Sequence, residues 1–468
     1  MNILIVGNGF DLSHYLPTKY DHFMVAMTAI ENWDEQNGEM SFDDLFGSLY
    51  EKENYFFKYT KAMYQTDEIK ISKDQIKDLK QKLKENVWYQ YFSDHVREVK
   101  TWIDFEQKIE EALNYTTDFI YKINDVYTKE NTLELEVRTT GYKKSDYDNK
   151  FLYLSEKSCN ALFNIGLLDK KFYEVVYDSG EVVVKYVESN SDKYKYFINP
   201  KNIKKFQNYD IYNNKDCVDY LNYKLDEFIC IFNFYLKLVD LINPINNFVF
   251  LPFDIDRVYS FNYTNTFRRF YSNEKKVNFL HGVSGNQQNI VLGISDLKDE
   301  SLKKIKAYGF TKYHQKLLKN TDYLFLTDIK EKVEKLIKSL EFNEEHLLDS
   351  FKNETQKASD EKFLAYLRGE LEKTNGNIYI WGHSLDISDD NYIKEIFSFN
   401  DSPKHNFNIV IFHYSNQAKF DLLTNLLHIL GKEKVERWMK KGWLKFEPNP
   451  DIVEINNIQP VDLPKFEK

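Results

Sequence analysis

The sequence predicts an α/β fold, a Rossmann-like and mainly parallel sheet that carries helical and antiparallel β insertions. Two observations predict it. Short apolar runs typical of buried strands lie far apart in the chain, with long helical patterns between them. Polar motifs follow four of these runs, and because ligands of open α/β sheets bind outside the carboxyl ends of strands, we expect them to share one pocket. The runs are residues 3–6, 258–261, 277–280 and 378–381, and the motifs are Gly7-Asn8-Gly9-Phe10-Asp11, Asn262-Tyr263, His281-Gly282 and Gly382-His383-Ser384.

Length and composition bound the class of protein. A chain of 468 residues is long enough for two or three domains, or for one large α/β domain with insertions. A formal net charge of -10 argues against a protein whose whole surface binds nucleic acid. The chain shows neither a signal peptide nor a membrane-spanning run, so we expect a cytoplasmic protein without a membrane partner. Cys159, Cys217 and Cys230 lack metal-ligand spacing, so we expect free thiols and no metal site.

The first third of the chain has the pattern of one βα unit followed by helices. Residues 2–7 predict a buried strand, and residues 20–30 predict a helix after Pro17. From residue 74 to 123, apolar and charged residues interleave with little Gly or Pro. This stretch predicts a helical layer.

The middle of the chain changes to β patterns. Runs of β-branched residues at 133–137 and 172–186 predict strands, and Asp178-Ser179-Gly180 breaks the second run as a hairpin turn would. We interpret this region as an antiparallel surface insertion that serves specificity or partner contacts rather than chemistry. A helix is expected over residues 218–241.

Buried strands then resume and complete the sheet. Residues 289–294 are expected to close the central group of strands, and residues 297–372 are mostly helical and charged. Two last strands are expected at 377–382 and 407–414, beside a helix that starts near Ser388. The predicted division is a discontinuous core of residues 1–60 and 245–460, with a helical segment 61–130, a β-rich insertion 131–215, a returning helix 216–244 and a helical insertion 297–372.

The first motif favours phosphate binding. Gly7 and Gly9 would let the backbone approach a phosphate, and the amino terminus of the next helix would add N–H donors. A tight turn without a ligand is the alternative, because Leu12 stands where a dinucleotide fingerprint has its third glycine. Asp11 would bind ribose hydroxyls or cap a turn.

The second motif is rich in hydrogen-bonding groups that suit a sugar. Asn262 lies in a cluster that also includes Ser260, Tyr263, Thr264, Asn265 and Thr266. The alternative is that these side chains satisfy the backbone of a loop.

Two histidine motifs follow the other strands. His281 precedes a glycine and is the preferred general base, since imidazole suits proton transfer near neutral pH, although a structural histidine would look the same. Gly382-His383-Ser384 resembles the start of a nucleophile elbow, but Asp386 replaces its second glycine, which argues against a serine hydrolase. This loop would instead donate Ser384 and backbone N–H groups to a ligand, or form a polar turn before a helix capped by Ser388.

Glu106 is a further site candidate, near the start of a predicted helix. Asp104 and Gln107 make a capping box there. Glu106 lies four residues from Trp102 and three from Ile109, which places its carboxylate on the apolar face. It therefore needs a partner or a raised pKa, and a salt bridge to a Lys or Arg is the structural alternative.

These motifs, in this order, resemble the AbiH family of bacterial phage abortive-infection proteins. The resemblance spans nearly the whole chain except residues 130–215. It rests on residues 4–12 with 16–20, residues 102–106, residues 260–265 with His281-Gly282, and residues 380–389.

The motif order is also similar to that of the sirtuin-like domains of antiphage proteins, several of which hydrolyse NAD. The resemblance implies a sirtuin-like core in which Asn262 and His281 serve catalysis. It departs from those domains at Gly-Asn-Gly-Phe-Asp, where they have Gly-Ala-Gly-x-Ser.

The sequence and the resemblance together predict a defence effector that binds a nucleotide. The expected nucleotide is NAD, and the protein would hydrolyse its nicotinamide–ribose bond. Catalysis would fall to His281 and Asn262, and a phage-derived trigger, a partner subunit or a second copy of the chain would be the macromolecular partner. Nucleotide binding would involve Gly7, Asn8, Gly9, Phe10, Asp11, Glu106, Tyr263, Gly382, His383 and Ser384.

Two alternatives stay open. One is a metal-dependent nuclease that would use Asp11, Asp104, Glu106 and Asp386 to hold Mg²⁺. The other is a nucleotide-binding sensor of infection that has no catalytic activity.

Overall fold

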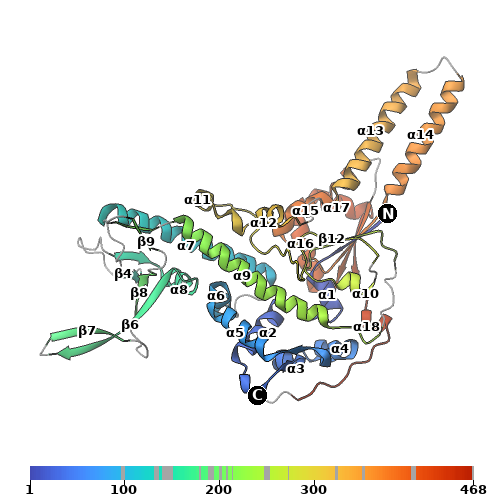
Figure 1. Ribbon diagram of the computed structural model, residues 1–468. Coiled ribbons are helices and arrows are strands. Elements are labelled where there is room, and N and C mark those ends of the chain that lie inside the picture. The colour runs from blue at the N-terminus through green and yellow to red at the C-terminus, as the bar shows by residue number, and fades with distance from the viewer. Residues whose placement is uncertain are drawn as a thin grey trace.

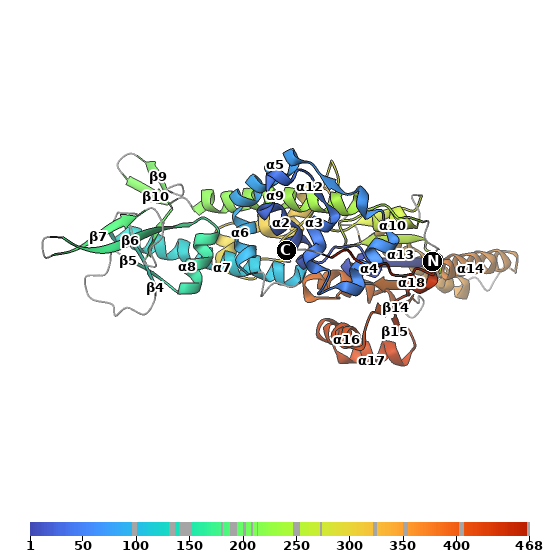
Figure 2. The same cartoon turned by 90° about the horizontal axis from the view of Figure 1, so that it is seen from below.

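The structure of the protein is a computed structural model with an elongated shape (Figures 1 and 2). A central α/β body lies between two projections. On one side the long helices α7 (Trp102–Glu130) and α9 (Asn214–Leu241) lead to a small β-sheet, and on the other α13 (Thr327–Asp349) and α14 (Glu354–Thr374) project together. The structure describes residues 1–95, 101–130, 136–139, 151–178, 181–187, 194–199, 203–206, 209–212, 214–246, 253–271, 274–321, 325–349, 354–401 and 407–465.

The body is built on a six-stranded sheet in which every strand pair is parallel. The four predicted strands are neighbours in it, so their carboxyl ends share one edge. Numbered along the chain, the strand order is 3-2-1-4-5-6, which confirms the Rossmann-like fold. The order in space is β12 (Val277–Phe279), β11 (Arg257–Ser260), β1 (Asn2–Val6), β13 (Gly376–Trp381), β14 (Phe407–His413) and β15 (Leu444–Pro448).

The strands are apolar throughout because both faces of the sheet are covered. Alternate side chains of β1 enter two different cores: Leu4 and Val6 face one, and Ile3 and Ile5 face the other. The first core contains α2 (Tyr20–Asn32), α5 (Lys73–Glu85), α6 (Val87–Asp94), α7 and α9, and the second contains α13 to α17.

The predicted amino-terminal helices are present. The helix expected at 20–30 is α2, and the helical layer expected over residues 74–123 is formed by the three helices α5, α6 and α7. Asn86 separates the first two, since its side chain accepts a hydrogen bond from Tyr89 N–H at 2.9 Å and caps α6. Short elements nearby are α1 (Asn8–Ser13), β2 (Met40–Ser41), α3 (Phe42–Phe46), α4 (Asn54–Met63) and β3 (Lys70–Ile71).

The predicted β insertion is a five-stranded sheet at the end of α7 and α9 (Figure 1). Its longest strands pair antiparallel as the predicted hairpin, whose turn residues 179–180 lie outside the described residues, as does most of the run at 133–137. One pair, β4 with β5, is parallel. The elements here are β4 (Glu136–Thr139), β5 (Phe151–Leu154), α8 (Glu156–Asn164), β6 (Leu168–Asp178), β7 (Glu181–Val187), β8 (Tyr194–Ile198), β9 (Ile203–Phe206) and β10 (Tyr209–Tyr212).

Two predictions about the later chain are wrong. Residues 289–294 form no strand. The Leu292 N–H and carbonyl are bonded to the Gln315 side chain, and Ile294 makes an isolated bridge to Thr311. Ser388 caps no helix, since it lies inside a 3₁₀ turn at Ile387–Asp389. The elements are α10 (Thr266–Phe270), α11 (Glu300–Lys304), α12 (Lys312–Lys319), α15 (Asp390–Ile396), α16 (Asn416–Leu430), α17 (Lys432–Lys440), the unpredicted β15 and α18 (Ile452–Ile455).

Candidate functional site

Two glycine-containing turns meet where the strand order reverses, between β1 and β13. The Gly9 N–H donates to the Gly382 carbonyl at 2.9 Å, and a Cβ on Gly9 would lie 2.7 Å from Gly382 Cα. A Cβ on Gly7 would lie 2.6 Å from His383 Cα. Close packing of the two turns thus explains these glycines, and the Gly9 N–H predicted to meet a phosphate already has a protein acceptor.

Gly382→Ala is expected to lower the free energy of unfolding by about 3 kcal/mol. Alanine is strained by about 1–2 kcal/mol at the left-handed φ of Gly382, which is +72°. Its Cβ would also lie 2.1 Å from the Phe10 backbone nitrogen, and such overpacking adds about 1–3 kcal/mol. Equilibrium urea unfolding measures the loss. Gly442→Ala is the control, because Gly442 has a φ of +71° with nothing within 4 Å, and equal losses in the two variants would contradict the packing argument.

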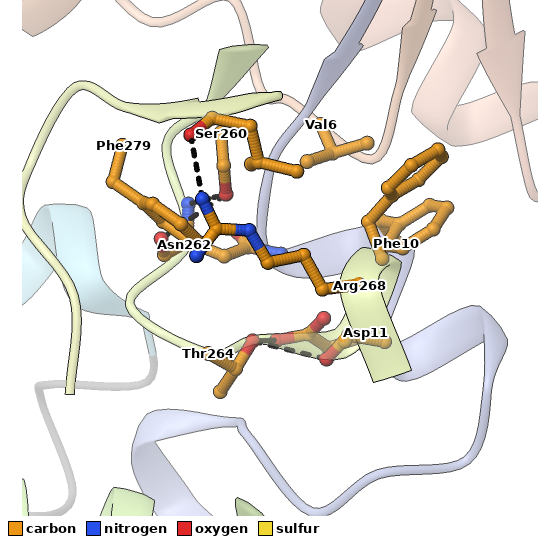
Figure 3. Close-up of a pocket in the computed structure, with 11 residues that line it drawn as sticks. Val6, Phe10, Asp11, Ser260, Asn262, Thr264, Arg268 and Phe279 are labelled. Carbon is orange, nitrogen blue, oxygen red and sulfur yellow. Dashed lines mark hydrogen bonds between the residues drawn. The ribbon is translucent and has the colours of Figure 1, made fainter. Parts of the chain in front are cut away.

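A buried set of polar side chains lies beyond the carboxyl ends of β1 and β11 (Figure 3). Thr264 Oγ1 donates to Asp11 Oδ2 at 2.6 Å, and Thr266 Oγ1 donates to Thr264 Oγ1 at 3.0 Å. Asp11 Oδ1 and Asn262 Nδ2 are buried, and neither has a hydrogen-bond partner among the described residues. Both line a cavity of about 10 Å³, which has room for one water, together with Val6, Phe10, Ser260, Thr264, Thr266, Phe267, Arg268, Val277 and Phe279.

Part of this group serves the loop itself. Ser260 Oγ bonds to both the N–H and the carbonyl of Asn262 at 3.1 Å, and Tyr263 Oη donates to the Val291 carbonyl at 3.0 Å. The structural interpretation therefore accounts for Ser260 and Tyr263. It does not account for the unpartnered amide of Asn262.

Asp11→Asn is expected to flatten the pH dependence of stability between pH 4 and pH 7. Burial raises the pKa of Asp11 from 3.8 to about 6, although Thr264 partly offsets it. Because the folded pKa is raised, the stabilising contribution is present below pH 3.8 and is lost as pH rises through 6. Two pKa units correspond to about 3 kcal/mol. Urea unfolding across this range measures how the free energy of unfolding changes with pH. Asp462→Asn, at a fully exposed position, is the control. If Asp11→Asn kept the pH dependence of the wild type, the raised pKa of Asp11 would be contradicted.

A second group, the charged cluster, joins five side chains from five parts of the chain. Glu106 lies in the first turns of α7, Lys312 begins α12, Asp389 ends the 3₁₀ turn, and His281 and His383 follow β12 and β13. Lys312 Nζ lies 2.7 Å from Glu106 Oε1 and 3.7 Å from Asp389 Oδ1, as ion pairs. The two imidazoles face the same aspartate, with His281 Nε2 at 3.6 Å from Asp389 Oδ1 and His383 Nε2 at 3.4 Å from Asp389 Oδ2.

Two members of the cluster, Asp389 and Lys312, are held in their charged forms. Burial alone would raise the pKa of Asp389, but Lys312 and the two histidines hold it well below 3.8. Burial alone would lower the pKa of Lys312, but Asp389 and Glu106 raise it. An ionised Asp389 therefore faces a protonated Lys312.

Glu106 and His281 are shifted toward their neutral forms. Burial raises the pKa of Glu106 to about 7, and Lys312 only partly offsets this. Burial and the nearby Lys316 lower the pKa of His281 to about 3. Glu106 Oε2 and His281 Nε2 are both buried and lack a hydrogen-bond partner in the part of the chain that the structure describes. The cluster thus holds an acid–base group near neutral pH beside a neutral imidazole.

His383 is oriented by its own turn. The Leu385 N–H donates to His383 Nδ1 at 2.9 Å, so Nδ1 is an acceptor and Nε2 carries the proton that faces Asp389. Ser384, in the same turn, is exposed, and its carbonyl accepts a hydrogen bond from Asn425.

Three members of this cluster, Glu106, His281 and His383, were predicted from the sequence, and Lys312 and Asp389 were not. The salt bridge foreseen for Glu106 is present, with Lys312 as its partner. Asp104 forms a capping box, but with Thr101 rather than Gln107, because the helix begins at Trp102 and puts Asp104 at its third position. Asp386 accepts the Ser388 N–H at 2.9 Å.

Neither metal ligands nor membrane spans are found in the described residues. They contain no group of three or more His, Cys, Asp or Glu side chains that could hold a metal ion. None of their helices combines the length and the apolar character that crossing a bilayer requires. The three cysteines are free thiols, as predicted.

Comparison with known proteins identifies the family. Residues 3–413 match the family model described as bacteriophage abortive infection AbiH. No curated protein and no solved structure matches the chain, so the similarity to sirtuin-like domains rests on the order of motifs alone. The match covers most of the chain and includes both polar groups at the carboxyl edge of the sheet, and the protein therefore belongs to the AbiH family of bacteriophage abortive-infection proteins.

Proposed function

We propose that this abortive-infection protein hydrolyses the nicotinamide–ribose bond of NAD, with Glu106 as the acid–base group. The observation that carries the proposal is the charged cluster. Glu106 pairs with Lys312 at 2.7 Å, yet its Oε2 has no hydrogen-bond partner among the described residues and the pKa of the carboxyl is raised to about 7. A carboxylate poised near the working pH suits proton transfer.

In the proposed step, a water oxygen attacks C1′ of the ribose while the bond to the nicotinamide nitrogen breaks. The bonding electrons stay on the pyridinium nitrogen, so nicotinamide leaves as a neutral molecule. The water gives one proton to Glu106 and the product is ADP-ribose. Asn262 would hold a ribose hydroxyl through its unpartnered amide.

His281 takes a different role from the general base expected from sequence. A pKa of about 3 makes its imidazole a poor base near pH 7. The neutral ring would instead use its unpartnered Nε2 to hydrogen-bond the attacking water or the substrate. Phe261, whose ring centroid lies 5.2 Å from that of His281, restricts the orientation of the imidazole.

The cluster is closed in this structure, which suits an effector that is restrained until infection. His281, Lys312 and Asp389 are at most 9% exposed. The cavity beside Asp11 and Asn262, about 10 Å³, is far smaller than a nucleotide. Access would require α12 to move. The nucleotide itself would select the open position, and a phage-derived trigger would increase the population of that position.

The experiment is incubation of the purified protein with NAD, with and without lysate of phage-infected cells. Nicotinamide and ADP-ribose are followed by chromatography. We expect both products in equal amounts, and much less of each from His281→Ala and Asn262→Ala. Cleavage of RNA or DNA with NAD intact would favour a nuclease, and NAD binding without turnover in either condition would favour a sensor.

A further inference from the structure

Lys316 is a buried lysine without an acidic partner. It lies one turn after Lys312 on the inner face of α12 and is 5% exposed. Its Nζ donates to Tyr392 Oη and lies 4.5 Å from the centroid of that ring. Within the described ranges, no carboxylate oxygen lies within the 4 Å ion-pair distance of this nitrogen.

Three other lysines shielded from solvent have acidic partners. Lys312 pairs with Glu106 at 2.7 Å, Lys61 with Asp43 at 2.8 Å, and Lys319 with Asp226 at 3.4 Å. Burying an ammonium without a counterion is costly. Lys316 therefore lacks the counterion that these three lysines have, and a bound anion would supply one.

The charge of the cluster supports the same conclusion. Asp389 balances Lys312, and while Glu106 is protonated the ammonium of Lys316 is in excess. An ammonium has three N–H donors, of which Tyr392 takes one, so two remain. Burial lowers the pKa of Lys316 to about 7, as expected for an amine without a counterion.

The glycine turn is poorly suited to hold a phosphate itself. Its Gly9 N–H is bonded to Gly382, and α1 has only six residues. Lys316 lies one turn after Lys312 on α12, and it is close enough to Asp389, Glu106 and His281 for these groups to influence one another's pKa values. A ligand whose phosphate met Lys316 would reach the charged cluster.

We propose that Lys316 binds a phosphate group of the nucleotide ligand, on the inner face of α12 and beside the charged cluster. This inference rests on the proposed site but not on hydrolysis, because binding of a product tests it. The ligand class is a nucleoside diphosphate derivative, and its pyrophosphate supplies the counterion that Lys316 lacks.

The test is calorimetric titration of the purified protein with ADP-ribose, inorganic pyrophosphate and adenosine. ADP-ribose and pyrophosphate should bind and adenosine should not. Lys316→Met should weaken ADP-ribose binding at least about tenfold, the effect of losing a charge-assisted hydrogen bond. Lys319→Met is the control, because Lys319 is on the same helix but pairs with Asp226, and its binding should stay within about twofold of wild type.

A second measurement keeps the inference testable if Lys316→Met does not fold. The affinity of wild-type protein for ADP-ribose should fall more than about tenfold from pH 6.5 to 8.5, because Lys316 loses its proton and Glu106 ionises beside it. Lys312 and Asp389 keep their charges in this range. Affinity that does not change with pH, unchanged binding by Lys316→Met, or binding of adenosine as tight as ADP-ribose would overturn the assignment. Phosphate binding without NAD turnover would leave it standing and reject the hydrolase alone.

Discussion

Glu106→Gln is expected to slow nicotinamide release about 10²–10⁴-fold, the usual contribution of a positioned acid–base group. Glutamine keeps the shape of glutamate and a hydrogen bond to Lys312, but it cannot accept a proton. In the wild type, the rate should rise with pH through about 7, because burial raises the pKa of Glu106 to about that value and a general base must be ionised. Initial rates from pH 5.5 to 8.5 measure both effects.

The control is Glu111→Gln on the same helix. Glu111 also pairs with a lysine, Lys108, at 2.6 Å, but its side chain is 37% exposed and lies outside the charged cluster. Its rate should stay close to that of wild type. If Glu106→Gln retained full turnover while folded, the assignment of Glu106 as the acid–base group would be wrong.

Lys312→Met is expected to lower the free energy of unfolding by about 3–5 kcal/mol, the range for breaking a buried ion pair from one side. Removing the ammonium leaves Glu106 and Asp389 buried without their cation. The decrease in the free energy of unfolding should grow as pH rises above 7, because Glu106 can no longer ionise beside an ammonium. Urea unfolding at pH 6 and pH 8 measures it.

Two further variants separate this effect from general loss of a lysine. Lys303→Met removes a 39% exposed lysine paired with Glu300, and its free energy of unfolding should stay close to that of wild type. The double variant Glu106→Gln and Lys312→Met should be less damaged than the sum of the single variants, since each removes the partner of the other. Additive losses would contradict a direct pair.

The sheet and its functional edge could be predicted because their patterns are local. A buried parallel strand is apolar along its whole length, so the runs ending at Val6, Phe261, Leu280 and Trp381 stand out in the sequence. Polar groups directly after such strands must lie at one edge of a parallel sheet. That rule brought His281 and His383 together, although about 100 residues separate them in the chain.

Lys312 was missed because α12 has the opposite of the usual amphipathic arrangement. Its apolar residues Tyr313, Leu317 and Leu318 are 67%, 44% and 71% exposed, while Lys312 and Lys316 are buried. A sequence pattern places leucines inside and lysines in solvent, so the two lysines look like ordinary surface charges. The burial of Lys312 is explained only by Glu106 and Asp389, which come from other parts of the chain.

The roles of the glycine turn and of Asp389 also depend on contacts between distant parts of the chain. Gly7 and Gly9 have the spacing of a phosphate-binding turn, but contact with Gly382, more than 370 positions away, explains them equally well. In the sequence, Asp389 is one of three aspartates within residues 386–390, and nothing distinguishes it from the other two. Only the placement of Lys312 and both histidines around it reveals its role.

The most direct test of the account is the NAD content of cells that restrict a phage through this protein. Extracts are taken through infection from cells expressing wild type, Glu106→Gln or Glu111→Gln at equal protein levels. We expect NAD to fall, ADP-ribose to rise and the phage to be restricted with wild type and Glu111→Gln, and all three effects to be lost with Glu106→Gln. Restriction of the phage by wild type with NAD unchanged would contradict it.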